Sequence, residues 1–177
     1  MGCRAVSDVR AMAALEEGDH AAAIAILDRS IKRDPTDGES YRLRGVAHMA
    51  AGNQEAAIAD FTDCLRYQAD EHDAYWMRGC AHLMAERYEL ASDDFSQCLR
   101  LQPDDPSALS SRAAAYLVTS QPERAIPDLD KAIELTPEDH RAYLYRQRGM
   151  TFAKLGRFDL TERDMAEYLR LAGDSAS

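Results

Sequence analysis

The sequence contains five histidines and four cysteines, residue types that can bind a metal ion or, for cysteine, form a disulfide, and two of these histidines and three of these cysteines are the candidates for such a site. His48 and His82 lie 34 residues apart, Cys64 and Cys98 are separated by the same interval, and Cys80 falls between the two cysteines. Zinc sites need convergent donors in spacings such as Cys-x-x-Cys, and the sequence contains no such spacing. We therefore expect packed histidines and compact buried thiols, with no metal site, no cofactor and the reducing cytoplasm as the compartment.

Arginines and aspartates recur together along the chain, and each aspartate follows its arginine by sixteen residues. The pairs are Arg44 with Asp60, Arg78 with Asp94, Arg112 with Asp128, and Arg148 with Asp164. If each pair spans two antiparallel helices, its members lie opposite one another. We predict structural ion pairs, each contributing under about 1 kcal/mol where it is exposed. An arginine-based ligand site is the alternative.

Residue patterns typical of catalysis are missing. The sequence shows no Ser/His/Asp order, no glycine-rich phosphate loop and no HExxH segment. Carboxylates scattered along helices do not define a general acid and a general base. We expect that the protein is not an enzyme and has no catalytic residue.

Charge and hydrophobicity limit the partners further. The chain has 177 residues, with 31 acidic and 21 basic side chains and a formal net charge of -10. Polyanions repel such a chain, so nucleic acid and anionic membranes are poor partners. No run of eighteen apolar residues occurs, and the first twenty residues lack the apolar stretch of a signal peptide. We expect a cytoplasmic protein, without membrane insertion, that binds protein or peptide partners.

The chemistry-bearing residues share one period because the whole chain repeats every 34 residues. Ala23, Ala57, Ala91 and Ala125 keep this spacing, as do Gly45 and Gly79, Phe61 and Phe95, and Pro103 and Pro137. A single domain, residues 1–177, then contains repeats at 4–37, 38–71, 72–105, 106–139 and 142–175. Sparse glycine and proline between Ala- and Leu-rich stretches predict an all-α chain. Two residues are inserted before Ala142, and we expect them to lengthen or loosen the start of the ninth helix.

Each repeat should be a helical hairpin. We predict ten helices, with hairpin turns near Gly18, Gly52, Arg87, Gln121 and Gly156. The recurring glycine and alanine fall where two helices cross closely, since a larger side chain would separate the backbones. Asp105 can cap the helix that follows it, and Pro106 fits a first helical turn.

These residues resemble the tetratricopeptide repeat, which has the same 34-residue period and small-residue pattern. The resemblance implies a right-handed superhelical solenoid of five helix-turn-helix hairpins, whose first helices line a concave groove for a peptide or a partner helix. One subtype grips the C-terminal carboxylates of chaperones with Lys and Asn on successive first helices. The corresponding places here hold Asp8, Met12, Leu43, Asp73 and Met77, so that clamp is absent.

The resemblance also indicates which side chains face the groove. The partner-binding residues it implies are Arg42, Val46, Met49, Asp73, Trp76, Cys80, Met84, Ser110, Ala114 and Arg146. Trp76, the only tryptophan, is the candidate central anchor. Asp73 and Glu39 would receive a basic partner group, whereas Arg42 and Arg146 favour an acidic one, so the sign of the ligand's charge stays open.

Three functions remain to be compared. The first is a non-catalytic interaction adaptor that holds a partner's peptide or helix and is itself a monomer or a weak dimer. The second is a structural scaffold that self-associates through an exposed C-terminal helix, where Leu160, Met165 and Tyr168 would form an apolar edge. The third, an enzyme or metalloprotein, would require a bound ion or cofactor.

Overall fold

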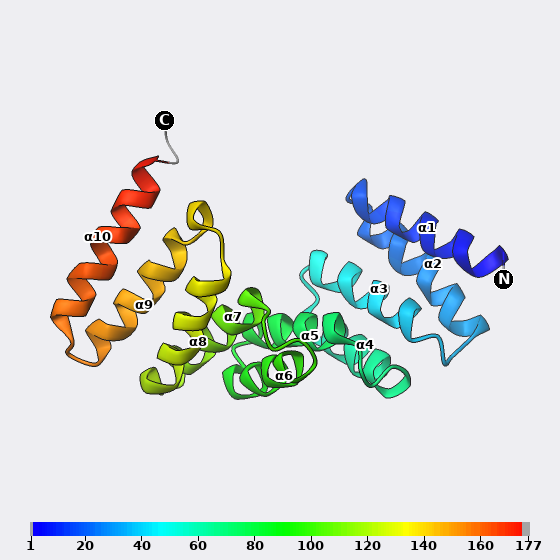
Figure 1. Ribbon diagram of the computed structural model, residues 1–177. Helices are drawn as coiled ribbons and strands as arrows, with labels where there is room; N and C mark the ends of the chain where they lie inside the picture. Colours follow the sequence, from blue (N-terminus) through cyan, green and yellow to red (C-terminus); the bar gives the residue numbers. More distant parts are fainter. Residues whose placement is uncertain (1, 175–177) are drawn as a thin grey trace. The chain divides into compact units, whose positions relative to one another are not determined.

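The protein consists of ten α-helices and one short 3-10 helix over the residues described. The computed structural model describes the backbone of residues 2–174 and the side chains of residues 8–173, and no strand occurs within these bounds. The helices are α1 (Gly2–Glu16), α2 (His20–Arg33), α3 (Gly38–Ala50), α4 (Gln54–Tyr67), α5 (His72–Met84), α6 (Tyr88–Leu101), α7 (Pro106–Val118), α8 (Pro122–Leu135), α9 (Ala142–Lys154) and α10 (Phe158–Asp174), with η1 (Glu138–His140) before α9 (Figure 1).

The turns between the two helices of each repeat fall where the period predicts them. One residue of each turn has a positive φ: Gly18 (76°), Gly52 (77°) and Gly156 (70°), but also Glu86 (58°) and Ser120 (57°). A left-handed residue after a helix lets the chain reverse, and glycine adopts this conformation without steric cost. The five predicted turns are confirmed, and two of them force a residue with a side chain into the left-handed region.

The insertion before α9 forms a separate element. Of the two inserted residues, His140 ends η1 (Glu138–His140) and Arg141 lies between η1 and α9, which has 13 residues, the same length as α3, α5 and α7. Arg141 follows η1 and donates from Nε to the carbonyl oxygen of Thr136 at 2.6 Å. The insertion therefore does not lengthen the ninth helix, because the 3-10 turn accommodates the extra residues, and the alternative expectation of a loosened start stays a prediction.

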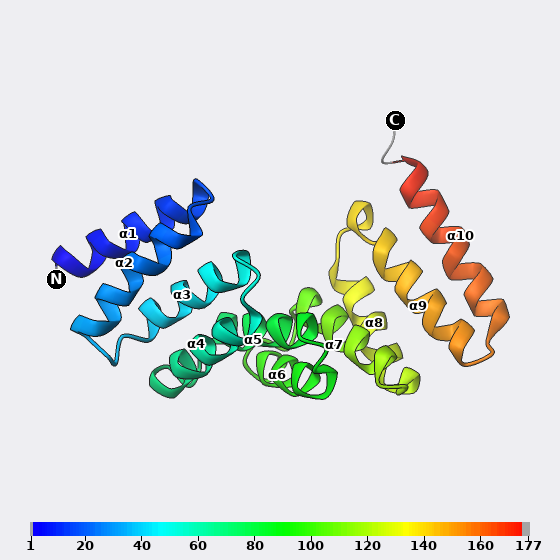
Figure 2. The same cartoon turned by 180° about the vertical axis from the view of Figure 1, so that it is seen from behind.

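Contacts between helices divide the chain into two compact units, Met1–Arg87 and Tyr88–Ser177. In unit 1, each helix from α1 to α5 packs on the next, and α3 also contacts α1 and α5. In unit 2, each helix from α6 to α10 packs on the next, and α7 also contacts α9. Within each unit, consecutive helices lie side by side from both directions of view (Figures 1 and 2). We call the exposed side of the odd-numbered helices the first-helix face of each unit.

Inside a repeat, a small residue of the first helix opposes a large residue of the second. Gly45 lies so close to Phe61 that a Cβ on the glycine would fall 2.7 Å from the ring atom Cε1. In the first repeat the equivalent residues are Ala11 and Leu27, both fully buried in one cluster. The two helices cross at this point, and the glycine makes room for the larger ring.

Candidate functional site

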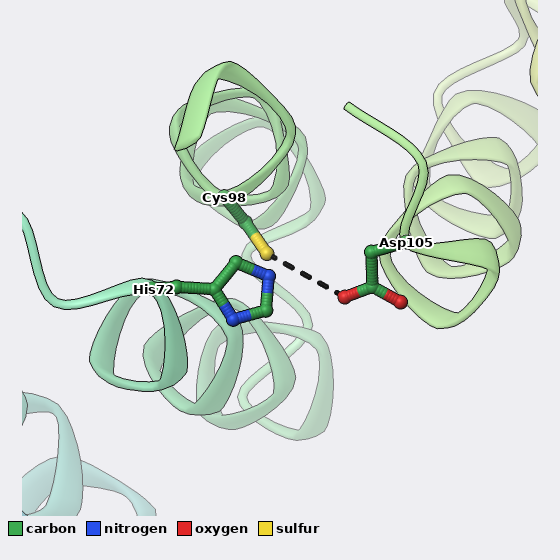
Figure 3. Close-up of side chains that lie close together, drawn as sticks. All are labelled: His72, Cys98 and Asp105. Carbon is green, nitrogen blue, oxygen red and sulfur yellow. Dashed lines mark hydrogen bonds between the residues drawn. The ribbon is translucent and has the colours of Figure 1, made fainter. Parts of the chain in front are cut away.

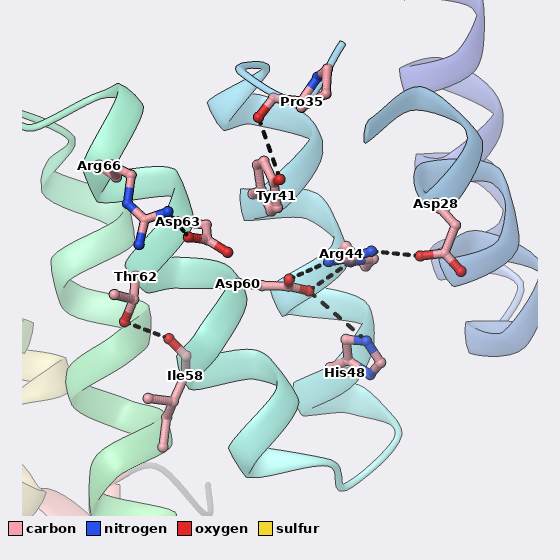
Figure 4. A network of polar contacts seen from close by, with 10 residues as sticks. All are labelled: Asp28, Pro35, Tyr41, Arg44, His48, Ile58, Asp60, Thr62, Asp63 and Arg66. Atoms are coloured by element: carbon pink, nitrogen blue, oxygen red, sulfur yellow. Dashed lines mark hydrogen bonds and ion pairs between the residues drawn. The ribbon is translucent and has the colours of Figure 1, made fainter. Parts of the chain in front are cut away.

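The arginine at the seventh place of a repeat joins three helices. Arg44 of α3 donates from Nε to Asp60 Oδ2 at 2.9 Å and from Nη2 to Asp60 Oδ1 at 2.6 Å. Its third nitrogen, Nη1, donates to Asp28 Oδ1 of α2 at 2.6 Å (Figure 4). The hydrogen bond to Asp60 raises the pKa of the Arg44 guanidinium above its ordinary value. All three polar nitrogens are occupied, so Arg44 is structural.

The same arrangement recurs in unit 2. Arg112 binds Asp128 through two nitrogens at 2.8 and 2.7 Å, and its Nη1 donates to Ser96 Oγ at 3.1 Å. Arg148 binds both oxygens of Asp164 at 2.8 and 2.7 Å. Arg148 also donates to Asp130 Oδ1 of the preceding repeat at 2.7 Å.

Three of the four predicted ion pairs are therefore confirmed. Arg78 donates to Thr62 Oγ1 at 3.1 Å within unit 1. Its predicted pairing with Asp94, a residue of unit 2, stays a prediction.

Cys64 and Cys98 are buried and Cys80 is half-buried, and none of these three cysteines forms a disulfide. Burial raises the pKa of Cys64 and of Cys80 to about 11. Cys98 of α6 points toward Asp105 and donates from Sγ to Asp105 Oδ2 at 3.9 Å (Figure 3). Asp105 also accepts backbone hydrogen bonds at the start of α7, as predicted for a capping residue. The three thiols are thus packing groups, as predicted, and the thiols of Cys64 and Cys80 stay almost entirely protonated at neutral pH.

His48 is half-buried and His82 is buried, both within unit 1. His48 Nε2 lies 3.9 Å from Asp60 Oδ2 (Figure 4), while its buried Nδ1 has no hydrogen-bond partner among the described residues. His82 is buried in α5. The expectation of packed histidines is confirmed, although full hydrogen bonding of His48 is not.

In unit 1 the side chains that the resemblance places in the groove differ in how far they are exposed to a partner. Val46 and Met49 of α3 pack against the buried cluster of Ala57, Phe61 and Ala81. On α5, Trp76 and Cys80 are half-buried, whereas Asp73 and Met84 are exposed. The Trp76 indole nitrogen Nε1 is enclosed and has no hydrogen-bond acceptor among the side chains and backbone described. Val46 and Met49 therefore serve the core as well as the surface.

The charges of this part of unit 1 compensate one another. Arg42 donates from Nε and Nη2 to the two carboxylate oxygens of Glu39 at 2.8 and 2.6 Å. This bonding raises the pKa of Arg42, and the negative charges of Glu71 and Asp73 act in the same direction. His72, drawn in Figure 3, also lies next to Asp73, with Nδ1 and Oδ1 3.1 Å apart. Arg42 is thus already neutralised within unit 1.

In unit 2 the first-helix face contains a hollow on α9. Tyr143, Arg146, Gln147 and Met150 line this space of about 240 Å³. Of the residues implied from the sequence, Arg146 is exposed beside it, Ala114 is half-buried, and Ser110 is only 8% exposed. Ser110 contributes its backbone instead, because its carbonyl oxygen accepts a hydrogen bond from Gln147 Nε2 at 3.1 Å.

Sequence reasoning missed Tyr143 and Gln147. Tyr143 holds the same place in its repeat as Asp73, so the period could have indicated it. Gln147 follows the inward-facing Arg146 directly, and no spacing signals its bond to α7.

Comparison with known proteins decides the family. The sequence profile of the tetratricopeptide repeat matches residues 9–74, 43–106 and 76–140, which together cover more than half of the chain. The chain belongs to the tetratricopeptide repeat family. No curated protein sequence is significantly similar to this tetratricopeptide repeat protein as a whole.

Several solved structures have a similar fold at low sequence identity. The structure of MamA matches with a TM-score of 0.89 at 20% identity, covering 94% of this chain and 96% of that one. MamA residues 41-end from Desulfovibrio magneticus RS-1 match with a TM-score of 0.92 at 21% identity, covering 100% and 99%. YrrB, described as a TPR protein with an unusual peptide-binding site, matches with a TM-score of 0.84 at 18% identity, covering 93% and 84%.

These matches confirm the predicted fold class, an all-α solenoid of tetratricopeptide-type hairpins. In the described part of the chain, every helix is too short or too polar to traverse a lipid bilayer.

Proposed function

We propose that this tetratricopeptide repeat protein is a non-catalytic adaptor that holds a peptide or a helix of a partner protein on its first-helix faces. The observation that carries the proposal is the hollow on α9, where the apolar side chains of Tyr143 and Met150 are about half exposed next to Arg146. Tetratricopeptide repeats generally bind protein or peptide partners on such a surface. The peptide-binding site named for YrrB supports the same type of ligand.

The proposed contact residues lie on the two first-helix faces, seven in unit 1 and three in unit 2. They are Arg42, Val46, Met49, Asp73, Trp76, Cys80, Met84, Ser110, Ala114 and Arg146. The proposal includes no catalytic residue, cofactor or metal ion, because the chain's arginines and cysteines that could do chemistry are largely engaged in packing. We further propose that the protein acts in the cytoplasm as a monomer or weak dimer, without nucleic acid or membrane partners.

A pull-down with mapped variants tests the proposal. The intact chain is immobilised, proteins retained from the source lysate are identified, and the strongest binder is purified and titrated against the chain. Truncating a central aromatic anchor should weaken binding by about 2 kcal/mol or more, so Trp76→Ala should do so while helicity by circular dichroism is retained.

Leu90→Ala is the matched control, because Leu90 is 50% exposed but lies on a second helix, α6. The adaptor function is wrong if no protein binds the chain directly. Trp76 is a packing residue rather than an anchor if its truncation lowers only the unfolding midpoint.

Self-association is the second candidate function, and α10 favours it. Phe158 is 67% exposed and Leu169 is 65% exposed, and both lie on this helix. The apolar edge at Leu160, Met165 and Tyr168 stays a prediction, and these three side chains are partly exposed. Sedimentation over a wide concentration range tests the scaffold, and a monomer at high concentration removes it.

A further inference from the structure

We infer that the hollow on α9 binds an acidic side chain of the partner peptide together with a neighbouring apolar one. This inference rests on the proposed function and defines the chemistry of its ligand in unit 2. The four lining residues offer one positive charge, one amide and two large apolar or aromatic surfaces.

The first-helix face of unit 2 is positive although the whole chain has a net charge of -10. Neither α7 (Pro106–Val118) nor α9 (Ala142–Lys154) contains an aspartate or a glutamate. Their arginines Arg112 and Arg148 are bound to Asp128 and Asp164 of the second helices. The positive charge that remains available on this face is therefore not balanced by carboxylates of the same helices.

Arg146 is the arginine of α9 that has no carboxylate partner among the described residues, and it is exposed. Lys154, two turns further along the same side of α9, donates to the carbonyl oxygen of Leu117 at 3.3 Å and forms no ion pair with a carboxylate of residues 8–173. A guanidinium with free donors binds a carboxylate through two parallel hydrogen bonds, which gives both affinity and orientation. Arg146 is thus suited to an aspartate or glutamate side chain.

The hollow itself fits side chains rather than a free small molecule. Its volume of about 240 Å³ lies below the roughly 300–1,000 Å³ of typical small-molecule clefts. Tyr143 is 51% exposed and Met150 is 52% exposed, so a partner's apolar group would cover them. Gln147 is fixed by its bond to the Ser110 carbonyl, which leaves one wall of the hollow defined before a ligand arrives.

In unit 1 the arginine at the place equivalent to Arg146 is Arg42, which is already paired. Arg42 is bound to both carboxylate oxygens of Glu39, and a ligand carboxylate would have to displace that pair. The contrast between Arg42 and Arg146 assigns the acidic part of the ligand to α9.

Selection from a random peptide library displayed on phage tests this inference with the intact chain. We expect the selected peptides to contain Asp or Glu next to Leu, Phe or Tyr. A synthetic, fluorescently labelled peptide of the consensus is then titrated by fluorescence anisotropy. Arg146→Gln should weaken its binding about tenfold, Met150→Ala several-fold, and added salt should weaken the wild type more than Arg146→Gln.

Arg163→Gln is the matched control, because Arg163 is exposed on α10 and has no ion-pair partner among the described side chains. Helicity of each variant is compared by circular dichroism. Selected peptides that lack acidic residues, or that bind Arg146→Gln as well as wild type, overturn the inference and leave the adaptor function standing. A selection that enriches no peptide overturns both.

Discussion

The crossing of α3 and α4 allows a quantitative test of how the repeat is packed. Gly45→Ala places a methyl group 2.7 Å from Phe61 Cε1, a distance at which the ring or the backbone must move. Overpacking of this kind lowers the free energy of unfolding by about 1–3 kcal/mol, and the better helix propensity of alanine raises it by about 0.5–1 kcal/mol. We expect a net loss of about 1–2 kcal/mol in the free energy of unfolding.

Phe61→Leu alone should also destabilise the protein, because it leaves a gap above Gly45. Full truncation of a buried phenylalanine costs about 3–5 kcal/mol, and leucine retains much of that volume, so we expect about 1–2 kcal/mol. The double variant recreates the pair that the first repeat contains at Ala11 and Leu27, both fully buried. The double variant should therefore lose less unfolding free energy than the two single variants together, with a coupling energy of about 1–2 kcal/mol.

Urea denaturation followed by far-ultraviolet circular dichroism measures all four members of this cycle. Gly149→Ala is the control, because a Cβ there would lie 3.3 Å from Asp164 Cβ and 3.4 Å from the flexible Met165 Sδ. We expect its effect to stay within about 0.5 kcal/mol, where overpacking and helix propensity nearly cancel. If the loss of the double variant equals the sum of the losses of Gly45→Ala and Phe61→Leu within about 0.5 kcal/mol, the proposed matching of residue sizes at the helix crossing is refuted.

Three further predictions concern the turns, the ion pairs and the thiols. Ser120→Gly should raise the free energy of unfolding by up to about 1 kcal/mol, because Ser120 has a φ of 57°. Gly52→Ala should lower it by about 1 kcal/mol because of the positive φ at this position, although the added Cβ would meet nothing within 4 Å. Asp60→Asn should cost about 2–3 kcal/mol, since it leaves the half-buried Arg44 guanidinium with only one carboxylate partner. Burial raises the pKa of Cys64 to about 11, so this thiol should react with iodoacetamide far more slowly at pH 8 than an exposed thiol. The rate of the reaction, followed by mass spectrometry, should increase as the pH rises.

Each of these predictions has a matched reference. Glu138→Gln removes an exposed ion pair with Arg170 and should lower the free energy of unfolding by less than about 1 kcal/mol. An equally small loss for Asp60→Asn would contradict the burial of the Arg44–Asp60 pair. Unfolding in urea should make Cys64 react at the rate of a free thiol. Rapid labelling of the folded protein at pH 8 would show that the thiol is accessible. A loss of stability in Ser120→Gly would show that the serine side chain, not the backbone, determines that turn.

The sequence alone was sufficient for those features that depend on the period. Small residues, turns and the three ion pairs within the units follow from residues repeated every 34 positions, because equivalent places in a repeat meet equivalent neighbours. The 3-10 helix η1 was not predicted, since it arises from an insertion outside the period. That residues 1–177 form a single domain stays a prediction, and the number of transitions in denaturation tests it.

The character of the candidate surface depended on contacts that no spacing reveals. Arg42 and Arg146 hold the same place in their repeats, and the sequence could not distinguish them as ligands. Glu39 lies one turn before Arg42 and neutralises it, while Tyr143 takes the equivalent place before Arg146 and offers no charge. A local pairing between side chains therefore decides which arginine a partner can use.

The arginine at the seventh place of a repeat also donates a hydrogen bond to the preceding repeat, and this bond affects how the array unfolds from its ends. Arg44 and Arg148 reach back to Asp28 and Asp130 in the preceding repeat, whereas Arg78 and Arg112 reach back to the hydroxyl groups of Thr62 and Ser96. Charged acceptors therefore join the first repeat to the second and the fourth to the fifth. These are the junctions where a linear array frays first, because a terminal hairpin has a neighbour on one side only. Charge-assisted bonds are about twice as strong as neutral ones, so this arginine makes its stronger bond to the preceding repeat at the two junctions where unfolding from an end would begin.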